Sequence, residues 1–373
     1  MARSAVIATA AAATILLGPA SACVCGGWFA DDPIVFVEPS PILEGESAGS
    51  LGAARAAEDT LQTPPLEILP PPSKQASGPP KDDRSPFRSQ SYWIGPQNVR
   101  SQPGDWSQAG QQINLAAPIF IAPEGGNLWL ATGSVDHTSI GATAVLPDSG
   151  LPVPDDLWKV QAGAMNIRDL ENGWKTVAIL TVGYASDQPF TSLRDATFTA
   201  IGGLEVPRGE RDAWSFSLFY SPTSQLPFPL PGVAYIWRPN DQFTANLGVP
   251  FSLRYRPTER FSVVASYFPL TNVNILARQE LTDAWSLYGG YQVVNETYWL
   301  ADRAERNERF YLFDQRVKVG LQRSLLAGLT LDLSAGYVFD RQAFQADGFS
   351  DNRRDEIAID PSAFGALQLS WSL

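Results

Sequence analysis

Residues 328–341 read GLTLDLSAGYVFDR, and this stretch decides the fold. Its large apolar side chains fall at every second position from Leu329 to Leu333 and again at Tyr337 and Phe339, with mainly Thr, Asp, Ser and Gly between them. A period of two places the apolar residues on one face of an extended strand and the polar residues on the other. The stretch therefore predicts a β-strand with one apolar and one polar face.

The same alternation recurs along residues 91–373, between clusters of Gly, Pro, Asn and Asp. Clear examples are RFYLFDQRVKVGLQRS (309–324), AWSFSLFY (213–220) and PFSLRYRP (250–257). The longer segments have the ~9–11 residues with which a tilted strand crosses a membrane, and their aromatic residues lie mainly near segment ends. The pattern predicts an all-β fold, an antiparallel transmembrane β-barrel of about 12–14 strands.

The connections between these segments differ in length and character. SLLAG (324–328) is tight, whereas 342–360 reads as a long, charged loop. Short turns on one side and long polar loops on the other are typical of outer-membrane barrels. Two similar turns, AYIWRPNDQF (234–243) and LRYRPTERF (253–261), complicate this count, because the chain between them is too short to cross a membrane twice. Either one turn faces outward or Pro250 marks a bend in a strand.

A soluble, secreted β-sandwich that binds a ligand through its Trp residues would also alternate. Two features favour the barrel: a closed sheet has no exposed edge, and the polar face mixes small residues with charges of both signs, as a lumen would. The predicted lumen and charge network comprises Lys159, Arg254, Arg256, Arg278, Glu280, Asp302, Arg303, Arg306, Arg309, Asp314, Arg316, Lys318 and Asp332.

The N-terminal region predicts export. A basic residue, an apolar run and Ala20-Ser21-Ala22 form a secretory signal peptide over residues 1–22, and Cys23 is a candidate for lipidation. Residues 23–90 are rich in Pro, which favours a disordered, extended periplasmic linker. No segment resembles a transmembrane helix.

Composition excludes several classes of function. A net charge of −12 with scattered Lys and Arg disfavours nucleic acid as a partner. Two Cys and one His are too few for a Cys/His zinc site. No motif binds a phosphate or a cofactor, so we expect no cofactor.

The stretches LPGVAYIWRPNDQF, SLRYRPTERFSVVASYFPLTNV and YWLADRAERNERFY resemble a bacterial outer-membrane β-barrel family of unknown function. The resemblance covers most of Leu151 to Leu373. It implies a barrel fold and a location in the outer membrane. It implies no activity, substrate or catalytic residue.

His137 and Ser139 form the one candidate catalytic pair. Residues two apart on a strand project from the same face, where an imidazole can activate a hydroxyl. Outer-membrane phospholipases and lipid A deacylases resemble this H-x-S arrangement, but their third, orienting group has no counterpart before Asn166. A solvated histidine at a strand end is the alternative, and we expect no enzyme.

Two charged segments are predicted to have a structural role and not a catalytic or binding role. YWLADRAERNERFY (298–311) carries six charges of balanced sign, which predicts mutual ion pairing in a loop, with a selectivity element or cation site as alternatives. In the acidic loop at 350–360, Asp351, Asp355, Glu356 and Asp360 could bind Ca²⁺, although their spacing is irregular.

The sequence thus predicts an outer-membrane β-barrel that is a passive pore or a structural membrane component; its permeant stays unknown. An outer-membrane lipid hydrolase using His137 and Ser139 is one alternative, and a soluble secreted binding protein is another. The final strand, FGALQLSWSL, predicts lipid-facing Leu367, Leu369, Trp371 and Leu373. The expected partners are outer-membrane lipids and the barrel insertion machinery, which would recognise this strand.

Overall fold

The computed structural model describes residues 86–372 except 101, 123–125, 224–227, 269–271, 304 and 350–352. The predicted signal peptide, Cys23 and nearly all of the Pro-rich segment lie outside the described residues. No helix in the described part of the chain is long and apolar enough to cross a membrane.

The described residues form seventeen strands and two short 3₁₀ helices, and the first strand begins four residues before the predicted boundary at 91. In chain order they are β1 (Phe87–Asn98), β2 (Asp105–Ile121), β3 (Asn127–Ala142), β4 (Asp156–Asp169), β5 (Lys175–Ser186), η1 (Leu193–Asp195), β6 (Ala196–Arg208), β7 (Asp212–Tyr220), β8 (Leu230–Asn240), β9 (Phe243–Gly248), β10 (Phe251–Thr258), β11 (Phe261–Phe268), β12 (Asn272–Glu280), β13 (Trp285–Tyr298), β14 (Arg309–Ser324), η2 (Leu326–Gly328), β15 (Leu329–Ala346), β16 (Arg354–Ile359) and β17 (Ser362–Trp371).

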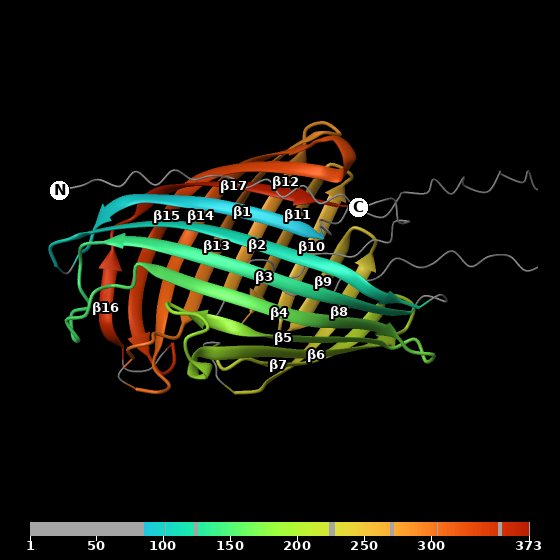
Figure 1. Ribbon diagram of the computed structural model, residues 1–373. Coiled ribbons are helices and arrows are strands. Elements are labelled where there is room, and N and C mark those ends of the chain that lie inside the picture. Colours follow the sequence, from blue (N-terminus) through green and yellow to red (C-terminus); the bar gives the residue numbers. More distant parts are fainter. Residues whose placement is uncertain are drawn as a thin grey trace, which may run out of the picture.

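The strands close into one antiparallel barrel (Figure 1), as the alternation predicts. Closure occurs at β1, which pairs with β2 on one side and with β17 on the other. Both β16 and β17 pair with β15, at successive levels, so together they fill a single position in the wall. The wall therefore has sixteen positions in the described residues, and the predicted 12–14 strands is too low.

The missing strands lie partly between the two similar turns. Both turns are at the same end of the barrel, and the chain between them forms β9 and β10, joined at Val249 and Pro250. β9 has only six residues and β10 eight. Both explanations offered from the sequence are wrong: neither turn faces the other way, and Pro250 lies in a tight turn. A second shortfall is at 342–360, most of which is strand and not loop.

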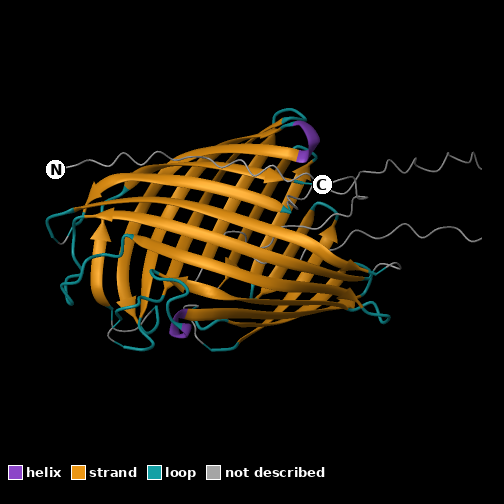
Figure 2. Ribbon diagram, viewed as in Figure 1, coloured by secondary structure: helices purple, strands orange, loops and turns teal. Residues whose placement is uncertain are grey.

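The barrel has two distinct rims. The terminal rim, where β1 begins beside the end of β17, carries the short connections, including the two-residue turn between β10 and β11. The opposite loop rim carries most of the long connections, such as those at 143–155 and 299–308. Figure 2 shows the longer loops gathered at this rim. The predicted difference between short turns and long loops is confirmed.

The outward face is apolar along the membrane-crossing part of the strands. Trp93, Leu333 and Val319 are 57, 55 and 62% exposed, although their inward neighbours in the same strands are buried or half-buried. Leu367 and Trp371 of β17 are also outward and exposed, as predicted. Such a continuous apolar exterior needs a non-aqueous surrounding. It argues against the soluble β-sandwich.

Strand length divides the wall into unequal regions. We call β2–β4 and β13–β15 the tall walls, because these strands have 14–18 residues. We call β8–β12 the low wall, because its strands have 6–11. A strand of six residues is shorter than the ~9–11 that a bilayer crossing requires. The tall walls accordingly extend beyond the membrane-crossing level at the loop rim, whereas the low wall does not.

Candidate functional site

An apolar cluster closes part of the lumen at the loop rim. We call it the cap, and its members are Val99, Trp106, Ile140, Ala144, Leu146, Val153, Leu157, Ala185, Tyr298, Leu300, Phe310, Leu312, Ala343, Ile357 and Ile359. They belong to β2–β5, to β13–β16 and to the loops of these strands. The cap joins opposite sides of the barrel, because β13 lies against β4 and β5. None of its members comes from the described residues of β6–β12.

Main-chain contacts fix the loop at 299–308 across this opening. Trp299 donates its N–H to the Ala185 carbonyl at 2.8 Å. Ala301 donates its N–H to the Asp187 carboxylate at 2.9 Å. Burial raises the pKa of the Asp187 carboxyl, while the Ala301 N–H opposes that shift. The loop therefore binds the far wall through backbone groups.

The charges of YWLADRAERNERFY are engaged mainly with other segments. Arg303 forms an ion pair with Asp195, with 2.7 Å between Nη1 and Oδ1, and both side chains are nearly inaccessible. Glu308 pairs with Arg354 at 3.2 Å, and Arg309 donates to the Pro222 carbonyl. Asp302 and Arg306 are also in this loop. The prediction that these charges pair with one another is thus wrong. The ion pairs of Arg303 and Glu308 instead connect the loop to other segments.

Beneath the cap, polar side chains bridge the two tall walls. Lys159 of β4 lies 4.7 Å from the ring centre of Tyr298 on β13. Tyr298 in turn donates its hydroxyl hydrogen bond to Glu296 at 2.7 Å. These contacts join strands on opposite sides of the barrel. We call this group of side chains, with Tyr92 and Arg316, the polar bridge.

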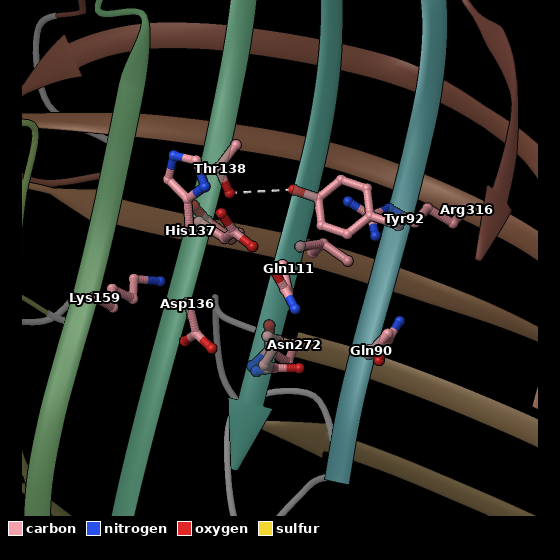
Figure 3. Close-up of a pocket in the computed structure, with 13 residues that line it drawn as sticks. Gln90, Tyr92, Gln111, Asp136, His137, Thr138, Lys159, Asn272 and Arg316 are labelled. Atoms are coloured by element: carbon pink, nitrogen blue, oxygen red, sulfur yellow. Dashed lines mark hydrogen bonds between the residues drawn. The ribbon is translucent and has the colours of Figure 1, made fainter. Parts of the chain in front are cut away.

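Tyr92 and Arg316 form the other end of the polar bridge. The Tyr92 hydroxyl lies 3.2 Å from Thr138 Oγ1, and Gln108 donates to it at 3.0 Å. Arg316 lies 5.4 Å from the Tyr92 ring centre and donates two hydrogen bonds to Asp314, at 2.6 and 2.9 Å. Figure 3 shows Tyr92, Thr138 and Arg316 around a polar pocket, with Lys159 and Asp136 at its other side. Such a bridge narrows the lumen and fixes the spacing of the walls.

Most residues of the predicted lumen network share the inward face. Their register alternates with exposed apolar residues such as Val317 and Val319. The inward members are Lys159, Arg254, Arg278, Glu280, Asp314, Arg316, Lys318 and Asp332. Arg256 lies at the rim end of β10 and donates to the Glu259 carbonyl at 2.9 Å. Asp332 accepts a hydrogen bond from Tyr288 at 2.7 Å. Their role in permeation stays a prediction.

The residues proposed for Ca²⁺ serve other contacts. Asp355 accepts hydrogen bonds from the N–H groups of Asp148 and Ser149, at 2.8 and 2.9 Å, and pins the loop at 143–155 to β16. Asp360 pairs with Arg100. Among the described residues, no group of three or more His, Cys, Asp or Glu could hold a metal ion.

His137 and Ser139 alternate with the inward Asp136 and Thr138 and lie on the outer face of β3, where His137 also borders the polar pocket of Figure 3. The His137 ring stacks on Trp158 with 3.9 Å between ring centres. Its Nε2 lies 2.7 Å from Oδ1 of Asp156 at the start of β4. Asp156 pairs in register with Ser139 itself. A third, orienting group is therefore present, and only the register of β3 with β4 could have revealed it.

A closed, all-β wall with an apolar exterior and a polar interior defines an outer-membrane type of β-barrel. Residues 127–371 match the model of a family described as Domain of unknown function (DUF6268), which covers well over half of the chain. The protein belongs to this family, as the resemblance in its motifs predicts.

Several solved β-barrel structures resemble this chain, with low sequence identity and low TM-scores. An outer membrane channel from Pseudomonas putida F1 has 10% identity, a TM-score of 0.36, and covers 78% of this chain and 96% of its own. A BenF-like porin from Pseudomonas fluorescens Pf-5 has 12% identity, a TM-score of 0.26, and coverages of 77 and 98%. The β domain of the Bordetella autotransporter BrkA has 11% identity, a TM-score of 0.29, and coverages of 78 and 99%. No curated protein matches. The barrel assignment rests on the strand pairing.

Proposed function

We propose that the protein is a passive pore of the outer membrane, with a path that runs along the low wall. The observation that carries this proposal is the composition of the cap, which draws no described residue from β6–β12. The inward register of the low wall instead holds small polar residues that are partly exposed, among them Thr244, Ser262 and Asn274. Polar, small side chains favour a hydrated path over a packed core.

The orientation follows from general barrel architecture. We propose that the terminal rim faces the periplasm and the loop rim the exterior, since bacterial barrels have short periplasmic turns and longer outer loops. We further propose that β17, with its outward Leu367 and Trp371, is the strand that insertion machinery recognises.

Planar-bilayer recording of the refolded full chain tests the pore. Stepwise conductance is expected, and a change in gel mobility on boiling checks that the preparation is a closed barrel. Val264 and Leu276 lie on the inward face of β11 and β12. Replacing Val264 with Trp should lower the unit conductance, whereas Val319→Trp on the outward face should not. A folded barrel without conductance would instead be a structural membrane component.

A second candidate function, lipid ester hydrolysis, is favoured by the hydrogen bond between His137 and Asp156. In this proposal the Ser139 hydroxyl attacks an ester carbonyl, His137 takes its proton and then gives it to the leaving alcohol, and water releases the acyl group. Asp156 holds the imidazole. Phospholipid hydrolysis that is lost in Ser139→Ala but kept in Ser91→Ala, another outward serine, would support it. Absence of hydrolysis by the unaltered protein would end it.

A further inference from the structure

We infer that the pore has a lateral opening above the β9–β10 hairpin, through which small amphipathic molecules exchange between the lumen and the outer leaflet. This inference rests on the proposed pore and on its proposed orientation. β9 has six residues and β10 eight, and they join at Val249 and Pro250. A tilted strand of six residues rises about 15 Å, whereas the apolar band of an outer-membrane barrel is about 25 Å tall. The hairpin therefore ends inside the apolar layer.

The outward face of the low wall supports this depth, because it is apolar almost to the ends of its strands. Leu247 of β9 and Tyr267 of β11 are 48 and 45% exposed, and each is the last residue but one of its strand. On β14, the next outward residue after the exposed Val317, toward the loop rim, is Gln315, which donates to Asp340 at 2.8 Å. The tall wall thus reaches a polar boundary on its outward face, whereas the described strands β9 and β11 end before one.

Two aromatic side chains meet on the lumen side of the low wall. Phe219 of β7 and Phe268 of β11 are inward, because the residue before each of them is outward and exposed. Their ring centres are 5.1 Å apart, and the ring planes make an angle of 67°. β8, β9 and β10 lie between β7 and β11 in the wall, so this contact reaches across three strands. We call these two rings the aromatic pair.

The register places the aromatic pair beyond the end of the hairpin, toward the loop rim. β9 ends at Gly248, which pairs with Ala234 of β8. Phe219 instead pairs with Leu230, the residue at the loop-rim end of β8. Phe268 is the last residue of β11 and lies beyond the first position of β10. The aromatic pair therefore lies between the lumen and the lipid at a level where the hairpin has ended.

The lining of this route suits a molecule with a polar and an apolar part. The inward face of β11 and β12 combines the partly exposed Ser262 and Asn274 with Val264 and Leu276. Beyond them the route passes the two phenyl rings and reaches acyl chains. An apolar group can enter the lipid there without crossing the headgroup layer, while a polar group stays in contact with the lumen. Salt ions cannot leave by this route, and they need the opening at the loop rim.

Photo-crosslinking to lipid tests the lateral opening on the refolded full chain, independently of conduction. Phe219→p-benzoylphenylalanine and Phe268→p-benzoylphenylalanine are placed in phosphatidylcholine vesicles and irradiated, and lipid adducts are measured by mass spectrometry. Both should form adducts, as should the same change at the outward Phe216. Gln161, inward on β4 in a tall wall, is the matched control. Its adduct yield should be about tenfold lower, because a closed wall excludes lipid.

Passage is tested with N-phenyl-1-naphthylamine, an apolar amine whose fluorescence rises in lipid, added to cells that carry the full chain in the outer membrane. The double change Phe219→Ala and Phe268→Ala should speed dye entry several-fold, because it removes the rings that lie across the route. The unit conductance in KCl should stay unchanged. Phe198→Ala with Tyr220→Ala removes a similar pair of rings, 5.3 Å apart, from the outward face and is the matched control.

The outcomes separate the lateral opening from the pore itself. A heat-modifiable barrel without conductance overturns the proposed pore, and with it this exchange. Conductance with no lipid adducts at Phe219 and Phe268, or with equal adducts at Gln161, overturns only the lateral opening. So does a rise in dye entry that is matched by an equal rise in unit conductance, because the aromatic pair would then narrow the axial path. Adducts without faster dye entry in the double Ala variant overturn the passage of amphipathic molecules.

Discussion

The tall walls and the low wall are built from the same alternating pattern, yet they use their inward faces differently. β14 and β15 have 16 and 18 residues, and beyond the membrane-crossing level their inward side chains are large and apolar, such as Phe310 and Leu312. β9 has six residues, and its inward side chains are Thr244 and Asn246. The tall walls therefore pack against each other, whereas the low wall can only line a space.

This difference indicates that the tall walls stabilise the barrel, whereas the low wall lines the proposed path for a permeant. A wide barrel closes part of its lumen only where strands are long enough to reach across above the bilayer. Where the strands stop early, the lumen keeps polar side chains and fixed charges. The comparison predicts large losses of stability from changes in the tall walls, and effects on lipid contact or permeation from changes in the low wall.

The largest effect is expected in the cap. Phe310 of β14 is fully buried within the cap. Phe310→Ala should lower the free energy of unfolding by about 3–5 kcal/mol, because it removes buried apolar contacts and leaves a cavity. Urea unfolding in detergent micelles measures the change. Leu193→Ala, at a residue 86% exposed in a loop, is the control. Equal losses in the two variants would mean that the cap is not packed.

A somewhat smaller loss is expected from the loop that crosses the opening. Arg303→Ala leaves the Asp195 carboxylate buried without its ion pair, which should cost about 3 kcal/mol. The double change Arg303→Met and Asp195→Leu should recover the part of the loss that comes from the unpaired carboxylate, but not the hydrogen bonds that Arg303 donates to the Leu300 and Arg194 carbonyls. Unfolding free energies of the three proteins measure this. If the single and double variants are equally destabilised, the ion pair is not the cause.

In the low wall, the turn at Val249 should lie within the apolar layer. β9 is too short to cross a bilayer, and its turn has few free donors because Pro250 has no N–H and Val249 donates to the Val233 carbonyl. Val249→Lys should therefore cost about 1–2 kcal/mol, between the values for the midplane and the interface.

Val145→Lys provides the matched control for this depth. Val145 is 44% exposed in the loop between β3 and β4, where a lysine should cost almost nothing. Refolding into vesicles at graded urea concentrations compares the two variants. If the two variants have equal free energies of unfolding, the turn at Val249 lies in water and not in the apolar layer.

The sequence indicates which face of a strand a residue lies on better than it indicates which residue that side chain contacts. Alternation is local, so it separates the two faces of a strand, and Arg254, Asp314 and Lys318 lie on the face that the register turns inward. The contact of Lys159 with Tyr298 could not be predicted, because it requires opposite walls to approach each other. Asp156 was missed because its bond to His137 depends on the register between two strands. The strand count was too low because a strand of six residues gives too few alternations to recognise.

The smallest predicted effect concerns the pH dependence of loop docking. Burial raises the pKa of the Asp187 carboxyl, so the folded state binds its proton more tightly than the unfolded state does. Its favourable contribution is therefore complete below the unfolded pKa and is lost as the pH rises through the folded pKa. Protection of the Ala301 amide against hydrogen exchange should decline, after correction for intrinsic rates, as the pH rises through that range. Asp187→Asn should remove this decline, since an amide oxygen can still accept the Ala301 N–H but does not titrate. Asp241→Asn, on the opposite rim, controls for the lost charge. If the decline in protection persists in Asp187→Asn, another titratable group causes the pH dependence.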